Sequence, residues 1–241
     1  MRRGLRLTGA LLAGVLSTAL SRAAPASEGW EVVLEDAGIT VWRRPVEGSS
    51  LVEFRGHGIV DAPLINVAAV LRNSDRGREW MHGCSESGLV ERLSPFDAIV
   101  YNRVASPIFI VSDRDVVVEA RTTFLPDRRA VSVAFRSARH SGVPERSDAV
   151  RMPSIRGSWS LVAIGRHRTE VSYELRADPG GSLPSWIVNW ASERMPFDTI
   201  AGLRTQVTKP GYESDLHALR AALDWTPYEE EVSYASANAR Q

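Results

Sequence analysis

The stretch LVEFRGHGIVDAP, residues 51–63, contains the two patterns from which the fold is predicted. Its first part alternates between apolar and charged residues, so that Val52 and Phe54 share one face of a half-buried strand. Asp61 and Pro63 then favour the start of a helix, because an aspartate can cap the first turn and a proline fits within it. A strand followed at once by a helix predicts an α+β fold.

On both sides of this stretch the sequence predicts more strands. Residues 30–34 and 39–43 form two strands before it, and the helix that it starts runs to about residue 71, with a second short helix over residues 74–81. Six antiparallel strands are expected next, over residues 88–93, 98–104, 115–124, 130–136, 157–163 and 170–177. Because one face of these strands is apolar, the sheet needs a cover.

The cover is predicted in the C-terminal region. Residues 183–207 have apolar side chains at helical spacing, and Pro196 is expected to kink or interrupt this long helix. A last short helix is expected over residues 212–225, and the polar stretch 226–241 is expected to be a frayed tail. With no repeat and no linker, residues 27–225 are predicted to form one domain.

The first 26 residues have the pattern of a secretory signal peptide. Arginines at the start precede an apolar run of 14 residues over 7–20, and Ala24-Pro25-Ala26 is a small-x-small cleavage site. Because a bilayer span takes roughly 20 apolar residues, we expect a cleaved signal and a periplasmic or secreted product. An uncleaved N-terminal anchor is the alternative.

Composition limits the kinds of partner and of stabilisation. The predicted signal carries four of the 29 basic residues and no acid, so 25 basic and 29 acidic residues remain, a net charge near −4. That charge argues against nucleic acid as the main partner, since phosphate contacts need a basic surface. Cys84 is the only cysteine, so no intramolecular disulfide can form and a hydrophobic core must stabilise the fold.

Several segments, in order along the chain, resemble the START domain, the steroidogenic acute regulatory protein-related lipid-transfer family. They are EFRGHGIVDAP at 53–63, REWM at 78–81, SDRD at 112–115, GSWSL at 157–161, and DPGG at 178–181 with LP at 183–184 and NW at 189–190. The resemblance covers residues 30–208 and implies a helix-grip (Bet v 1-like) fold, in which a curved antiparallel sheet wraps around the long C-terminal helix. It also implies a tunnel for one lipid-like molecule and no cofactor.

The resemblance places the tunnel entrance near the long helix and the loop over residues 106–112. Ile108, Phe109 and Ile110 make this loop apolar, although loops normally face water. One interpretation is a lid edge that contacts a membrane, and the other is a loop that packs against the helix.

Polar residues on otherwise apolar faces are the candidates for holding a headgroup. Arg103 shares a strand face with Tyr101, and Glu193 and Arg204 fall on the apolar stripe of the long helix if its phase continues through the proline. A kink would instead turn Glu193 to solvent. Sterol-carrying family members often pair an acidic residue before the entrance loop with an arginine after it. The matching positions here are Tyr101 and Ala120, so the ligand of those members is not implied.

The apolar stripe of the long helix supplies the remaining candidates for the tunnel lining. They are Trp186, Trp190, Phe197, Ile200 and Leu203, and ordinary core packing is the alternative for each. No catalytic or metal site is predicted. The acidic and basic residues at 113–115 suggest a structural salt bridge, and His82 and Cys84 have no second ligand pair nearby. No nucleophile or phosphate-loop motif is present.

The predicted function is therefore non-catalytic binding of a lipid or sterol-like molecule, with transfer between membranes by a monomer that contacts them transiently. Two alternatives remain open. One is a cyclase- or hydrolase-like enzyme that acts on a hydrophobic substrate in the same pocket, as related helix-grip cyclases do. The other is a ligand-sensing protein that binds a protein partner through the helix over residues 212–225. The absence of a catalytic motif favours carriage.

Overall fold

The computed structural model of the chain describes residues 29–106, 108, 110–181, 189 and 193–229. The predicted signal peptide, residues 1–26, lies outside the described residues, as do Phe109, Trp186 and Trp190. None of the described helices is long and apolar enough to cross a membrane.

One antiparallel sheet dominates the described part of the chain. Its strands are β1 (Glu31–Asp36), β2 (Ile39–Pro45), β3 (Val52–Val60), β4 (Cys84–Arg92), β5 (Ala98–Val104), β6 (Asp113–Leu125), β7 (Ala130–Ser137), β8 (Ala149–Arg151), β9 (Ser154–Gly165) and β10 (Arg168–Asp178). The order across the sheet is β1-β2-β3-β10-β9-β7-β6-β5-β4, and β8 lies parallel beside β6. Every predicted strand overlaps an observed one, and the three-residue β8 was not predicted.

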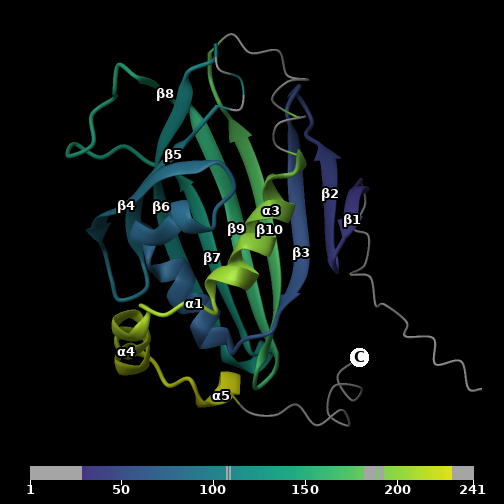
Figure 1. Cartoon of the computed structure of the whole chain (residues 1–241), viewed down its shortest axis with the longest axis vertical. Coiled ribbons are helices and arrows are strands. Elements are labelled where there is room, and N and C mark those ends of the chain that lie inside the picture. Colours follow the sequence, from purple (N-terminus) through teal and green to yellow (C-terminus); the bar gives the residue numbers. More distant parts are fainter. Residues whose placement is uncertain (1–28, 107, 109, 182–188, 190–192, 230–241) are drawn as a thin grey trace, which may run out of the picture.

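The helices lie on one face and at one end of this sheet (Figure 1). They are α1 (Leu64–Arg72), the 3₁₀ helices η1 (Ser74–Glu79) and η2 (Pro126–Arg128), and α3 (Met195–Gln206), α4 (Glu213–Ala222) and α5 (Thr226–Glu229). Figure 1 shows α3 crossing in front of β3, β10 and β9, with α1 and η1 beside it. The sheet and α3 together form the predicted helix-grip fold.

Three predicted helix features differ from the structure or are refined by it. The chain turns at Arg194 and α3 begins at Met195 with Pro196 in its first turn, which confirms the interruption at the proline. Asp61 does not cap α1, because its carboxylate pairs instead with Arg168. The tail was predicted to begin at residue 226, but α5 occupies residues 226–229 and Tyr228 is only 2% exposed.

Glycine allows α3 to lie close to the sheet and to η1. A Cβ atom at Gly56 of β3 would stand 2.7 Å from the Cβ of Pro196 and 2.9 Å from the side chain of Ile200. A Cβ atom at Gly202 of α3 would stand 2.1 Å from the carbonyl oxygen of Trp80. All three separations are shorter than any van der Waals contact, so larger residues would push the helix away and open the core.

Candidate functional site

A cavity of about 540 Å³ lies between the inner face of the sheet and the helices that cover it. This volume is in the range of small-molecule sites in proteins. Its walls come mainly from β5, β6, β7, β9 and β10, together with α1, η1, α3 and the loop before β6. The apolar lining residues are Val70, Leu71, Trp80, Met81, Val100, Val104, Ala105, Ile108, Val111, Val116, Val118, Ala120, Val133, Phe135, Met152, Ile155, Trp159, Leu175, Ala177 and Met195.

Aromatic rings form one wall of this cavity. The rings of Trp159 and Tyr173 stack with centroids 4.1 Å apart, and the ring of Trp80 lies 5.9 Å from that of Trp159. Burial raises the pKa of the Tyr173 hydroxyl well above its usual range, so this hydroxyl stays protonated at neutral pH. The wall is therefore apolar and uncharged.

The polar residues that line the cavity are few and mostly engaged. The Nδ1 atom of His82 lies 3.0 Å from a carboxylate oxygen of Asp198, and the His82 backbone N–H donates to the hydroxyl of Thr199. Burial raises the pKa of the Cys84 thiol, which donates to the backbone carbonyl of Glu86. The thiol is therefore not activated as a nucleophile. Among the described residues no group of three potential metal ligands comes together.

One end of the cavity, which we call the mouth, is lined by Ala105, Ser106, Ile108 and Val111 of the loop before β6, the mouth loop. Ile110 of the same loop does not line the cavity and is 76% exposed. Asp113 fixes the base of this loop, because one carboxylate oxygen accepts the backbone N–H of Ser106 at 3.0 Å and the other accepts Nε of Arg103 at 2.8 Å.

Arg114, which lines the cavity at this end, joins the mouth loop to the chain after β10. Its guanidinium donates to the backbone carbonyls of Ser112, Pro179 and Gly180. Burial lowers its pKa, and neighbouring Asp113 opposes that shift. No carboxylate forms an ion pair with Arg114 in the part of the chain that the structure describes. Arg114 therefore links these two loops by hydrogen bonds.

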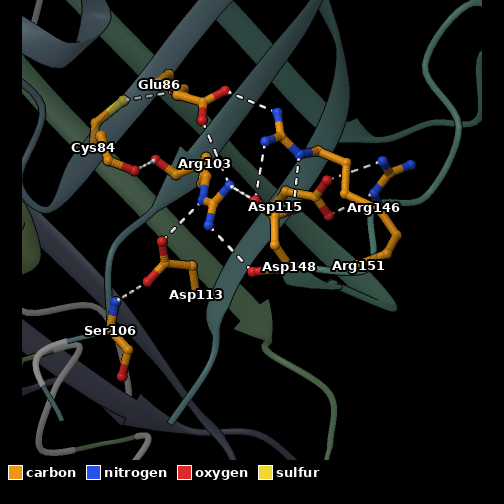
Figure 2. A network of polar contacts seen from close by, with 10 residues as sticks. Cys84, Glu86, Arg103, Ser106, Asp113, Asp115, Arg146, Asp148 and Arg151 are labelled. Atoms are coloured by element: carbon orange, nitrogen blue, oxygen red, sulfur yellow. Dashed lines mark hydrogen bonds and ion pairs between the residues drawn. The ribbon is translucent and has the colours of Figure 1, made fainter. Parts of the chain in front are cut away.

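Two strand residues predicted to contact the ligand lie on the other face of the sheet. Tyr101 and Arg103 belong to the outer face of β5, whereas the residues between and beside them line the cavity: Val100, Asn102 and Val104. Figure 2 shows the Arg103 guanidinium among carboxylates, where it pairs with Glu86, Asp113 and Asp148. The structure therefore places both side chains outside the cavity lining. Because β5 carries apolar residues on both faces, its alternation does not reveal which face is inside.

The register also corrects the comparison with sterol-carrying members. Ala120 of β6 pairs with Ala98, and Tyr101 pairs with Val117 on the opposite face. The cavity-facing positions of β5 carry no acidic residue. The cavity-facing side of these two strands therefore carries no counterpart of that ion pair, and Tyr101 lies on the other side.

The α3 residues that were predicted to line the tunnel do not line the cavity. Phe197, Ile200 and Leu203 are buried in the core between α3 and the sheet and do not line the cavity. Their core-packing alternative is therefore the one that the structure supports, and Met195 and Thr199 line the cavity in their place.

The two predicted polar anchors on this helix also lie away from the cavity. Arg204 donates to the backbone carbonyls of Ile59, Ala37 and Gly38 and so holds α3 against β2 and β3. Glu193 is partly exposed and does not line the cavity. Trp80 and Met81, the last two residues of the REWM segment, do line it.

The comparisons with known proteins agree with this architecture. The START domain family model matches residues 14–210. An uncharacterized protein of Pseudomonas aeruginosa is 30% identical over 211 residues, which cover 87% of this chain and 100% of that protein. Human phosphatidylcholine transfer protein is 27% identical over 178 residues, 72% of this chain and 81% of that protein.

Among solved structures, a fragment of a STAR-related lipid transfer protein from Xanthomonas axonopodis is similar with a TM-score of 0.69. It is 32% identical and covers 76% of this chain and 100% of its own. The span matched by the family model includes every strand of the sheet, together with α1 and α3.

Proposed function

The chain belongs to the START domain family, and on this basis we propose that it binds a lipid or sterol-like molecule and transfers it between membranes without catalysis. The observation that carries the proposal is the cavity of about 540 Å³ with its apolar walls. Relatives support it, because the similar human protein transfers phosphatidylcholine by name and the Xanthomonas protein is titled a lipid transfer protein.

The physical requirement for such carriage is a place that removes hydrocarbon from water. Each methylene exposed to water costs about 0.8 kcal/mol, so a sixteen-carbon chain costs on the order of 12 kcal/mol in solution. Aliphatic and aromatic walls offset that cost without any covalent step. The engaged His82 and the unactivated Cys84 thiol fit a carrier better than an enzyme.

Ligand exchange requires contact between the mouth and a membrane. Ile110 is a large apolar residue at the mouth and 76% exposed, which suits insertion among lipid headgroups. Arg114 donates hydrogen bonds to backbone carbonyls of the mouth loop and of the chain after β10. These two segments would have to separate to admit a lipid.

The test measures transfer of fluorescent phosphatidylcholine from donor to acceptor vesicles of phosphatidylcholine and phosphatidylglycerol. Ile110→Asp should slow transfer on the order of tenfold, because a buried isoleucine is worth about 1.5–3 kcal/mol at the membrane. The matched control is Val32→Asp, since Val32 is an exposed apolar residue on the edge strand β1, 52% exposed. If the wild-type protein neither binds nor transfers any lipid offered, carriage is wrong.

We further propose that the protein acts outside the cytoplasm as a monomer, after removal of residues 1–26. The basis is the charged, apolar and small-residue pattern of that segment. N-terminal sequencing of the exported protein should begin at Ser27, and light scattering should give the mass of one chain. A product that retains its N-terminus in the membrane would support the uncleaved anchor instead.

A further inference from the structure

A second, narrow space of about 60 Å³ lies next to the main cavity, beside the end of β4. We call this space the narrow end; it is lined by Arg72 and Arg92 among other residues. It shares five lining residues with the main cavity, Leu71, Ser74, Val100, Ala120 and Val133. The two spaces are therefore adjacent and share part of their walls.

The narrow end lies at the opposite end of β5 from the mouth. Arg92 pairs with Ala98 at the start of β5, and Arg114 pairs with Val104 at its end. Six residues of strand separate these two levels, which is roughly 20 Å. An elongated molecule that occupied both spaces would therefore have one end near Arg92 and the other near the mouth.

The two arginines of the narrow end differ in their partners. Arg72 forms an ion pair with Asp215, which is only 4% exposed, and also donates to the carbonyl of Pro95. Arg92 has no ion pair with any carboxylate in the described chain. Its one recorded hydrogen bond there, from Nη2 to the Arg72 carbonyl, is long at 3.4 Å. Burial lowers the pKa of Arg92 and the like charge of Arg72 adds to that shift, whereas the carboxylates of Asp215 and Asp75 oppose it.

An arginine carries five N–H donors, so Arg92 retains most of its donors in a partly buried, water-sized space. Arg92 is partly buried, and Asp75 and Asp215 attract it without forming an ion pair. An incoming anion in direct contact would add charge-assisted hydrogen bonds to the donors that remain free. The volume of about 60 Å³ can hold a small polar group, since one water occupies about 30 Å³ of liquid. Arg114 is less suited to this role because three carbonyls already accept its hydrogen bonds.

We propose that Arg92 binds an oxyanion of the carried lipid, a carboxylate or a phosphate, while the hydrocarbon fills the main cavity. This inference rests on the proposed lipid-binding function and adds a polarity: the headgroup lies deep and the hydrocarbon extends toward the mouth. It also sets the ligand class, an anionic or phosphate-bearing amphiphile rather than an uncharged sterol or alcohol.

The experiment compares ligand pairs that differ only in the anionic group. Oleate is compared with oleyl alcohol, and 1-oleoyl-lysophosphatidate with 1-oleoylglycerol, by titration followed through tryptophan fluorescence and by native mass spectrometry. The wild-type protein should bind at least one anion on the order of tenfold more tightly than its neutral partner. Arg92→Met should abolish that preference and leave the neutral ligand unchanged, and Arg92→Lys should restore part of it.

Each outcome separates the inference from the proposed function. If Arg92→Met keeps the preference, or if the wild-type protein shows none, Arg92 is not the anion site although lipid binding stands. If only Arg114→Met removes the preference, the headgroup lies at the mouth and the inference is overturned. If no ligand of either pair binds, lipid binding and the inference both fail. If only oleate shows the preference, the site takes a carboxylate. If only lysophosphatidate shows it, the site takes a phosphate.

Discussion

The two faces of the β4–β6 part of the sheet use arginine in opposite ways. On the outer face, Arg103 and Arg146 both pair with Asp148, and each has at least one further carboxylate partner (Figure 2). On the inner face, Arg92 and Arg114 form no ion pair with any described carboxylate and donate only to backbone carbonyls. The two outer arginines are therefore paired with carboxylates of the protein itself, whereas the two inner arginines keep hydrogen-bond donors that a ligand can use.

The difference matters because the two environments have different dielectric properties. Exposed ion pairs are worth about 0–1 kcal/mol each, so the outer network mainly positions strands and loops. On the inner face the same charge costs more to leave unpaired, so a ligand that satisfies it gains more. Arg151 and Asp115 are the exception on the outer side, since their pair is buried.

The largest expected effect tests that buried pair. Asp115 is fully buried and accepts two hydrogen bonds from Arg151, at 2.8 and 3.0 Å. Arg151→Ala should lower the free energy of unfolding by about 3–5 kcal/mol, because it leaves a buried carboxylate without its counter-ion. Urea denaturation followed by circular dichroism measures the loss.

The control for this prediction is Arg146→Ala on the same outer face. Arg146 is 43% exposed in its side chain, and its removal should cost no more than about 1 kcal/mol. A double variant, Arg151→Met with Asp115→Leu, should recover most of the stability, since no charge remains buried. Equal losses for Arg151→Ala and Arg146→Ala would remove the distinction between buried and exposed pairs.

The second-largest expected effect comes from a substitution that fills part of the cavity on the inner face. Ala120 lines both the main cavity and the narrow end, so Ala120→Phe should obstruct their junction. Lipid affinity should fall on the order of tenfold, because the lost space excludes a lipid chain or its headgroup. The melting temperature should hold or rise, since an added ring fills empty volume. Native mass spectrometry with bound lipid and a thermal melt measure both.

Ala134 provides the matched control, because it is exposed on the outer side of β7 between two residues that line the cavity, Val133 and Phe135. Ala134→Phe should leave lipid affinity unchanged. If Ala120→Phe also leaves it unchanged, ligands do not reach the junction, and the main cavity alone accounts for binding.

Much of the fold could be predicted from the sequence because strand alternation and helix periodicity follow from burial. The limits of β5 were predicted at residues 98–104 as observed, and the strand predicted over residues 115–124 lies within β6. The interruption at Pro196 follows from its missing N–H and from its ring.

The site was less predictable, for physical reasons. On β5 both faces are largely apolar or aromatic, so the sequence does not show which face is inside. On β4 the register shifts twice, between Cys84 and Glu86 and between Leu89 and Glu91, which breaks the alternation that would place Arg92. The role of Arg92 depends on its neighbour Arg72, twenty positions away, and only the fold brings the two together.

The smallest expected effect is a pH dependence confined to the outer face. The Ser106 backbone N–H, and after it Arg103, hold the pKa of Asp113 below its usual value of 3.8, although burial opposes them. A carboxyl group with a lowered pKa stabilises the folded state above its unfolded pKa, and that stability is lost as the pH falls toward the folded pKa. The base of the mouth loop should therefore loosen only below about pH 4.

The Ser106 amide resonance in ¹H–¹⁵N NMR spectra measures this directly, and it should titrate with a midpoint below 3.8. Asp113→Asn should remove the titration. Binding of 1-oleoylglycerol, which carries no charge, should stay constant over the same range, because Asp113 lies on the face opposite the cavity lining. A Ser106 midpoint at or above the usual value would mean that Asp113 is not held by these donors. A parallel loss of neutral-lipid binding would mean that the outer network controls the mouth, so that the two faces are coupled and not independent.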